Sequence, residues 1–172
     1  MKRLASLACL LALTVHAAEP TIESDPFVIL DSLQLSRGEL ALTVDSSVGG
    51  RIASLRFQGQ EVLFSQSRAA ASNNWGSTFW LSPQSLWGWP PIETHDSKPY
   101  RVLAFEEDTA VLQSGSSAEA SITKRVSLSQ EREVSLDYEI LAVQDFTQVA
   151  PWEVTRVPMS GLVFYPVTRD SV

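Results

Sequence analysis

Side chains that alternate between apolar and polar along several segments constrain this sequence more than any other feature. In the clearest segment, 133–140, Val134, Leu136, Tyr138 and Ile140 alternate with polar residues. Successive side chains of a β-strand point to opposite faces, so a period of two indicates a strand with one buried face. The same period recurs in 39–44 and in 120–128, where Lys124 interrupts the apolar side. We predict that 120–128 and 133–140 pair as an antiparallel hairpin around Ser129 and Gln130.

Further short apolar segments are separated by Gly, Ser, Asp or Pro, which favour turns. No amphipathic helix of useful length follows the first twenty residues. Many short strands joined by short turns favour an all-β, antiparallel β-sandwich or barrel over an alternating α/β fold, and we predict the sandwich. The other expected strands are 27–30, 51–57, 61–64, 101–106, 110–113 and 161–165.

The beginning of the chain has the layout of a secretory signal peptide. Lys2 and Arg3 precede an apolar run over 4–15, and small residues follow at Ala17 and Ala18. The run is shorter than the roughly 20 residues that a membrane-spanning helix needs. We expect cleavage after Ala17, with Ala18 as the second choice, and a periplasmic or secreted product that is not held in a membrane.

The expected organisation is therefore a signal peptide over 1–17, an extended leader and first strand over 18–34, and one β-sandwich domain over 35–172. The single cysteine, Cys9, would leave with the signal, so the mature chain would have no disulfide and no cysteine nucleophile. The formal charge of −7 would lose the two positive charges of Lys2 and Arg3 and become −9. Such a charge disfavours nucleic acid and anionic membranes as partners.

Known cofactor and metal motifs do not stand out in the sequence. There is no glycine-rich phosphate loop, no paired-histidine metal spacing and no serine-nucleophile elbow. The Gly49-Gly50 pair is interpreted as a turn that starts a strand. We expect neither a metal nor a cofactor.

Residues 75–100 concentrate tryptophan and proline and are interpreted as a built loop region. Four of the five tryptophans fall there, next to four prolines. Indole faces are flat apolar platforms that suit sugar rings, whose hydroxyls need polar neighbours. The alternative is that the tryptophans close the end of the sandwich as core. The expected platform residues are Trp80, Trp87 and Trp89, with Asn73, Asn74, Gln84, His95 or Asp96 as polar neighbours.

A second dense patch covers 151–156. Strand alternation would place Trp152, Val154 and Arg156 on one face and Glu153 and Thr155 on the other. Glu153 or Arg156 could contact a substrate, although a solvated glutamate on an ordinary strand fits the pattern as well. His95 would be the only histidine of the mature chain, and a lone histidine in a loop more often faces solvent than catalyses.

Several of these segments together resemble the galactose mutarotase-like superfamily, which includes the aldose 1-epimerases, and most closely a bacterial branch of unassigned function within it. VGGRIASL at 48–55 is similar to the opening strand of that superfamily, and GQEVL at 59–63 to its next hairpin. WLSPQ at 80–84, WGWPP at 87–91 and APWEVTR at 150–156 are similar to the branch. The resemblance covers roughly residues 35–166, the N-terminal part of the expected β-supersandwich.

The resemblance implies a partial supersandwich and an affinity for sugars. In the epimerases the general base comes later than anything in this sequence, and their usual pair of histidines is not recognisable here. An enzyme of this kind would interconvert sugar anomers, with a base that takes the anomeric hydroxyl proton and an acid that protonates the ring oxygen. The residues nominated for these roles are Glu153 as base and His95 as acid, with Trp80, Trp87, Trp89 and Trp152 as platform and Arg156 as clamp.

The sequence thus favours an exported, non-catalytic carbohydrate-binding β-sandwich. One alternative is an aldose 1-epimerase-like mutarotase. Another is a truncated copy of a longer protein that serves as a structural or interaction domain, in which an exposed sheet edge would promote a homodimer.

Overall fold

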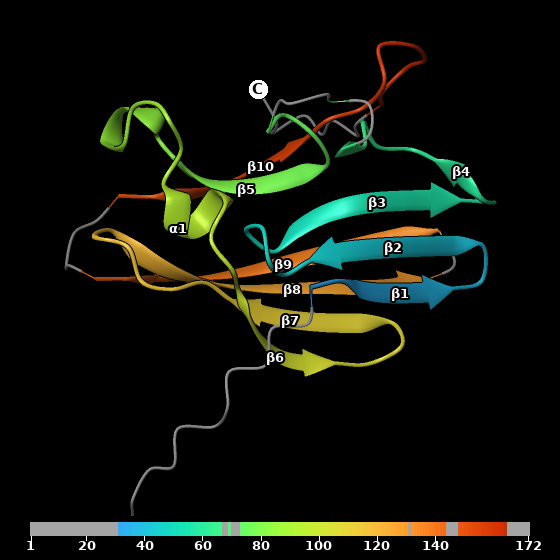
Figure 1. Ribbon diagram of the computed structural model, residues 1–172, viewed down its shortest axis with the longest axis horizontal. Helices are drawn as coiled ribbons and strands as arrows, with labels where there is room; N and C mark the ends of the chain where they lie inside the picture. Colours follow the sequence, from blue (N-terminus) through green and yellow to red (C-terminus); the bar gives the residue numbers. More distant parts are fainter. Residues whose placement is uncertain (1–30, 67–68, 70–72, 131, 144–147, 165–172) are drawn as a thin grey trace, which may run out of the picture.

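A computed structural model describes residues 31–66, 69, 73–130, 132–143 and 148–164. Two antiparallel sheets lie over one another as two layers (Figure 1). The predicted all-β sandwich is therefore confirmed. The expected signal peptide and the strand expected at 27–30 lie outside the described residues.

The first sheet has six strands in the order β1-β2-β3-β5-β10, with β4 paired to β3. The hydrophobic alternation of 40–44 produces the burial pattern of β2, whose Leu40, Leu42 and Val44 are buried. The strands are β1 (Leu33–Arg37), β2 (Leu40–Asp45), β3 (Arg51–Phe57), β4 (Gln60–Glu61), β5 (Ser77–Ser82) and β10 (Ala150–Thr155).

The second sheet has four strands in the order β6-β7-β8-β9. These strands are β6 (Arg101–Phe105), β7 (Thr109–Gln113), β8 (Ala120–Gln130) and β9 (Glu133–Ala142). Strands β8 and β9 pair antiparallel from Ala120 opposite Ala142 to Gln130 opposite Glu133. The hairpin predicted from their alternation is confirmed.

Apolar side chains from both sheets form the core between them. Leu35 and Leu42 of the first sheet join Leu112 and Val126 of the second in the larger cluster. A smaller cluster contains Phe79 of β5 and Ile122 of β8. Each sheet thus buries one face against the other, which is the usual way that a sandwich removes apolar surface from water.

Three sequence-based expectations need correction. Residues 161–164 form no strand, although the segment is apolar. The strand expected at 61–64 is reduced to β4, because Leu63 turns into the core. Within the region interpreted as a loop, β5 is a strand with five buried residues in succession, so it lacks the alternation that marks a half-exposed strand.

The rest of the 75–100 region is a loop, as expected, with a 3₁₀ turn, η2 (Gln84–Leu86), and one short helix, α1 (Glu93–Asp96). In Figure 1 the helix α1 lies beside β5 at one end of the sandwich. No helix among the described residues is long and apolar enough to cross a membrane. Helix α1 thus packs beside β5, and β5 pairs on the first sheet with β10.

Candidate functional site

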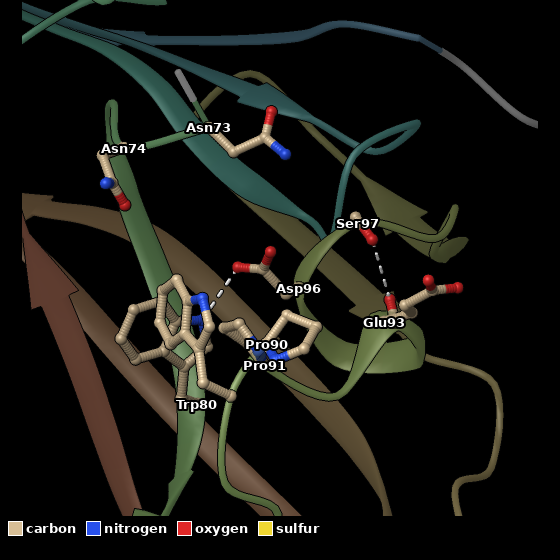
Figure 2. A pocket seen from close by; sticks show the side chains of 9 residues that line it. Asn73, Asn74, Trp80, Pro90, Pro91, Glu93, Asp96 and Ser97 are labelled. Atoms are coloured by element: carbon tan, nitrogen blue, oxygen red, sulfur yellow. Dashed lines mark hydrogen bonds between the residues drawn. The ribbon is translucent and has the colours of Figure 1, made fainter.

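A pocket of about 400 Å³ opens where the loop before β5, the loop after it and helix α1 come together. Figure 2 shows its side chains, with the Trp80 indole next to the Asp96 carboxylate and Asn73 and Asn74 on the neighbouring loop. The pocket therefore combines flat apolar walls with carboxylate, amide and hydroxyl groups. Its lining consists of Asn73, Asn74, Trp80, Trp89, Pro90, Pro91, Glu93, Asp96 and Ser97.

Trp80 is the centre of a tryptophan cluster at the pocket. The ring centroid of Trp80 lies 6.1 Å from that of Trp89, 5.9 Å from Trp87 and 5.5 Å from Trp152, in each case edge to face. Such contacts favour a fixed arrangement of the rings. Trp80 is only 9% exposed, whereas Trp89 is 65% exposed. Trp80 is therefore a support, and Trp89 offers the open indole surface.

Trp87 and Trp152 belong to the cluster without lining the pocket. The Trp87 indole donates to the Leu81 carbonyl oxygen over 2.8 Å, which fixes the loop after β5 to the strand. Trp152 stands directly opposite Trp80 in the β10–β5 register and is 38% exposed. Both rings hold Trp80 in place from the sides.

Asp96 is the most firmly held polar group of the pocket. Its Oδ1 accepts a hydrogen bond from Trp80 Nε1 over 2.8 Å and lies 3.5 Å from Nη2 of Arg51. The Asp96 side chain is 12% exposed, and that of Arg51 is 1% exposed. Burial lowers the pKa of Arg51, and the nearby Asp96 carboxylate offsets part of that effect. The pair fixes a carboxylate at the pocket wall with its counter-ion behind it.

Arg51 also ties together the two loops that carry the pocket's polar groups. Its Nη1 donates to the Asn73 carbonyl oxygen over 2.8 Å, and its guanidinium stacks over Trp75 at 4.4 Å. A planar guanidinium can serve several acceptors at once, which an ammonium group cannot do with the same geometry. Arg51 therefore positions Asn73 and Asp96 relative to each other.

Gly49 and Gly50 allow helix α1 to approach the start of β3 closely. Gly49 has a φ of +67°, and a Cβ there would lie 2.1 Å from the Asp96 carbonyl oxygen. At Gly50, φ is +55° and a Cβ would lie 2.9 Å from the Tyr100 ring. Only glycine fits both demands without strain. The turn predicted at Gly49-Gly50 before a strand is confirmed, since residues 46–50 form a turn and β3 begins at Arg51. This turn also supports the pocket wall.

Glu153 lies on the opposite, inner face of the same strand pair. Its Oε1 accepts a hydrogen bond from Ser77 Oγ over 2.6 Å, and its Oε2 accepts one from the Tyr138 hydroxyl. Nζ of Lys124 is 3.8 Å from Oε1, and the Lys124 side chain is 1% exposed. This inter-sheet cluster of Glu153, Ser77, Tyr138 and Lys124 places a buried charge pair between the two layers.

Burial dominates the electrostatics of the inter-sheet cluster. It lowers the pKa of Lys124, and the Glu153 carboxylate offsets part of the change. Burial and the same carboxylate raise the pKa of Tyr138. The tyrosine therefore stays a neutral donor to Glu153. Lys124 explains the interruption of the apolar alternation in β8, because its charge has a partner inside the sandwich.

The side chain of His95, which belongs to α1, is buried and does not face solvent. Its Nε2 lies 3.1 Å from the Ala120 carbonyl oxygen, and the side chain is 1% exposed. Burial lowers the pKa of His95. A neutral imidazole can donate from Nε2 to this carbonyl, so the contact joins α1 to the second sheet.

The structure brings together some of the residues nominated from the sequence and separates others. Trp80 and Trp89 line the pocket, and Trp87 and Trp152 contact Trp80. The Arg156 guanidinium carbon lies 5.4 Å from the centroid of the Trp80 ring, and its Nη1 donates to Thr78 Oγ1. Neither Glu153 nor His95 lines the pocket. The alternation proposed for 151–156 is confirmed, since Trp152 and Glu153 occupy opposite faces.

The sequence argument did not identify Glu93, Ser97, Pro90 and Pro91 as lining residues, nor Arg51 as their support. Two adjacent glycines before an arginine signal a close backbone approach, but they do not say which segment approaches. Asn73, Asn74 and Asp96, named only as polar neighbours of the tryptophans, do line the pocket. Within the described residues, no group of three or more His, Cys, Asp or Glu side chains could hold a metal ion.

Comparison of the chain with models of protein families, with curated proteins and with solved structures finds no match.

Proposed function

We propose that this protein binds a carbohydrate in the pocket beside Trp80 and Trp89, as an exported, non-catalytic β-sandwich. The observation that carries the proposal is the exposed Trp89 indole in a pocket that also holds Asn73, Asn74 and Asp96. A sugar ring has an apolar face for the indole and hydroxyls for the amide and carboxylate groups. The pocket volume of about 400 Å³ suits one or two such rings.

The resemblance of the Gly-Gly-Arg and tryptophan segments to the galactose mutarotase-like superfamily is part of this proposal. The antiparallel sandwich agrees with that resemblance at the level of architecture. Catalysis is not part of the proposal, because the nominated base and acid, Glu153 and His95, do not line the pocket. In this interpretation Glu153 and His95 support the fold.

The test is titration with a panel of mono- and oligosaccharides, followed by intrinsic tryptophan fluorescence. Changing Trp89 to Ala should weaken binding about tenfold, because an aromatic contact contributes about 1 to 1.5 kcal/mol. The melting temperature of the Trp89→Ala variant should stay near that of the wild type, since the Trp89 ring is largely exposed. Leu86→Ala is the matched control, because Leu86 is exposed on η2 and does not line the pocket.

Two results would contradict the proposal. If the folded wild-type protein binds no sugar of the panel, the proposal of carbohydrate binding is wrong. NMR can also show whether the protein accelerates the exchange of α-glucose or α-galactose anomers. If it does, and Glu153→Gln abolishes the acceleration without unfolding, the protein is an enzyme and not a non-catalytic binding protein.

Export belongs to the same proposal and has its own test. The charged, apolar and small-residue layout of residues 1–17 supports cleavage after Ala17. The intact mass of protein recovered from the periplasm or medium should correspond to a chain that starts at Ala18. A cytosolic protein with the mass of the full chain would contradict export.

A further inference from the structure

The charged side chains that the structure describes in the pocket lining are both acidic. They are Glu93 and Asp96, and no described lysine, arginine or histidine lines the pocket. Asn73, Asn74 and Ser97 supply the remaining polar groups, and Trp80 and Trp89 supply aromatic walls. Figure 2 shows the Asp96 carboxylate turned toward Trp80, whereas the Glu93 carboxylate points away from both. A ligand beside the indoles therefore meets the carboxylate of Asp96, and the exposed charge of Glu93 lies farther away.

The cations that balance these carboxylates lie outside the lining. Arg51 is buried behind Asp96 and has 1% of its side chain exposed. Lys98 pairs with Glu93 over 3.2 Å, but both side chains are more than half exposed, so water and salt weaken this pair. The Asp96 side chain is 12% exposed, so a ligand in the pocket can still reach its carboxylate.

Arg156 is a third nearby cation, and it too is turned away from the pocket. Its guanidinium lies over the Trp80 ring and donates to Thr78 and to the Val154 carbonyl oxygen. It is absent from the lining. No described cation is thus placed to pair with an acidic ligand inside the pocket.

The exposed ring of Trp89 would attract a positively charged ligand, as the Asp96 carboxylate would. The face of an indole carries partial negative charge, so it attracts a cation as well as an apolar sugar face. Aromatic rings combined with carboxylates are a common arrangement for the recognition of ammonium groups. The charge of the whole chain, −7, attracts cations in the same sense at longer range.

We propose that the carbohydrate taken by this pocket carries a protonated amino group, so that the ligand is an amino sugar. The proposal rests on the carbohydrate binding proposed above and specifies its ligand. The ammonium group lies near the Asp96 carboxylate and the Trp89 ring, and the ring hydroxyls bind Asn73, Asn74 and Ser97. A sugar acid is disfavoured, because its carboxylate would face Asp96 with no described cation beside it inside the pocket.

The experiment compares four sugars of the same ring geometry: glucosamine, N-acetylglucosamine, glucose and glucuronic acid. Binding to the mature protein is measured by tryptophan fluorescence and by ligand-detected NMR at mildly acidic pH, where the amine is protonated. We expect glucosamine to bind about tenfold more tightly than glucose or N-acetylglucosamine, since one cation–π and charge contact is added. Glucuronic acid should bind most weakly of the four.

Two variants locate the preference in the pocket. Glu93→Gln removes one exposed charge that points away from Trp80, with no expected effect on folding, and should reduce the glucosamine-to-glucose affinity ratio only slightly while glucose binding is kept. Asp96→Asn should reduce the ratio further, provided that its melting temperature shows a folded protein. Glu106→Gln is the matched control, because Glu106 is exposed beyond β6 in the other sheet. It should leave the ratio unchanged.

The outcomes separate this inference from the proposal on which it rests. If none of the four sugars binds, carbohydrate binding itself is wrong. If glucose binds as tightly as glucosamine, or glucuronic acid binds most tightly, the pocket takes sugars but the amino-sugar inference is wrong. A preference for glucosamine that persists in folded Asp96→Asn would also overturn it, because the Asp96 carboxylate would not be its cause.

Discussion

The two faces of the β5–β10 strand pair carry different kinds of polar group. Trp80 and Trp152 face each other on the outer side, next to the pocket, while Phe79 and Glu153 are the next pair in register and face the second sheet. On the outer side, Asp96 borders a cavity. On the inner side, Glu153 is enclosed by Ser77, Tyr138 and Lys124.

The difference shows how one strand pair can serve both stability and binding. A buried charge needs fixed partners inside the protein, and Glu153 has three. A binding site needs polar groups that a ligand can reach, and these lie on the other face. Since side chains alternate along a strand, a shift of one residue in register would exchange the two sets. The register of β10 against β5 therefore decides which residues can meet a ligand.

The largest expected effect tests the inner face. Glu153→Gln should lower the free energy of unfolding by about 3 to 5 kcal/mol, because it leaves Lys124 buried without its counter-ion. Denaturant unfolding measures the change, and Glu139→Gln on the exposed side of β9 is the control, with a change within about 0.5 kcal/mol. Adding Lys124→Met to Glu153→Gln should restore much of the loss.

An equal cost for Glu153→Gln and Glu139→Gln would show that the inner charge pair does not stabilise the fold. Loss of sugar binding in a Glu153→Gln protein of unchanged stability would move Glu153 into the binding site. Either result would remove the distinction between the two faces.

Arg51 connects the fold to the outer face, so its replacement should affect both. Arg51→Lys keeps the charge but loses the planar group that contacts Asn73, Trp75 and Asp96. We expect a loss of about 1.5 to 3 kcal/mol in the free energy of unfolding, the range for hydrogen bonds to charged groups. Sugar binding by the folded fraction should also weaken. Arg56→Lys is the control, since Arg56 is exposed on the same strand.

Normal sugar affinity in folded Arg51→Lys protein would show that the pocket does not depend on this arginine. Such a result would restrict Arg51 to a role in stability, like the role expected for Glu153 on the inner face.

A smaller effect is expected at Trp87, which contacts Trp80 but does not line the pocket. Trp87→Ala removes the hydrogen bond from the indole to Leu81 and should cost about 1 kcal/mol or somewhat more, while sugar affinity changes only a few-fold. Comparison with Trp89→Ala under the same titration tests this. A larger loss of affinity in Trp87→Ala than in Trp89→Ala would show that Trp87, and not Trp89, is the main sugar-binding ring.

The smallest effect concerns pH. Burial holds the pKa of His95 in the folded protein below the unfolded value of about 6.5. The contribution of neutral His95 to the free energy of unfolding is therefore fully present above that pH. The contribution is lost as pH falls through the lowered folded pKa, since the unfolded chain then binds the proton more readily. Thermal melts below about pH 6.5 should show decreasing stability, with a weaker pH dependence in His95→Gln. An identical pH dependence in both proteins would contradict a buried neutral His95.

Strands with one exposed face could be predicted from the sequence, whereas the strand that carries the site could not. The alternation in β2, β8 and β9 is direct, because β2 and β8 have a buried side and a more exposed side, and β9 has a partly buried side and an exposed one. In β5 five successive residues are buried, since its outer face is covered by the tryptophan cluster and α1. Periodicity disappears when both faces are covered. The apolar segment at 161–164 shows the reverse, because hydrophobicity alone does not form a strand.

By itself the sequence determined the all-β architecture and the concentration of four tryptophans within residues 75–100, because both depend on local composition and period. Only the tertiary structure decided which tryptophan is open, which carboxylate borders the pocket and where His95 and Glu153 lie. These depend on contacts between distant segments: Arg51 reaches Asp96, 45 residues further along the chain, and Ser77 reaches Glu153 across 76. Local patterns carry no information on such pairings, which are fixed when the two sheets and α1 pack together.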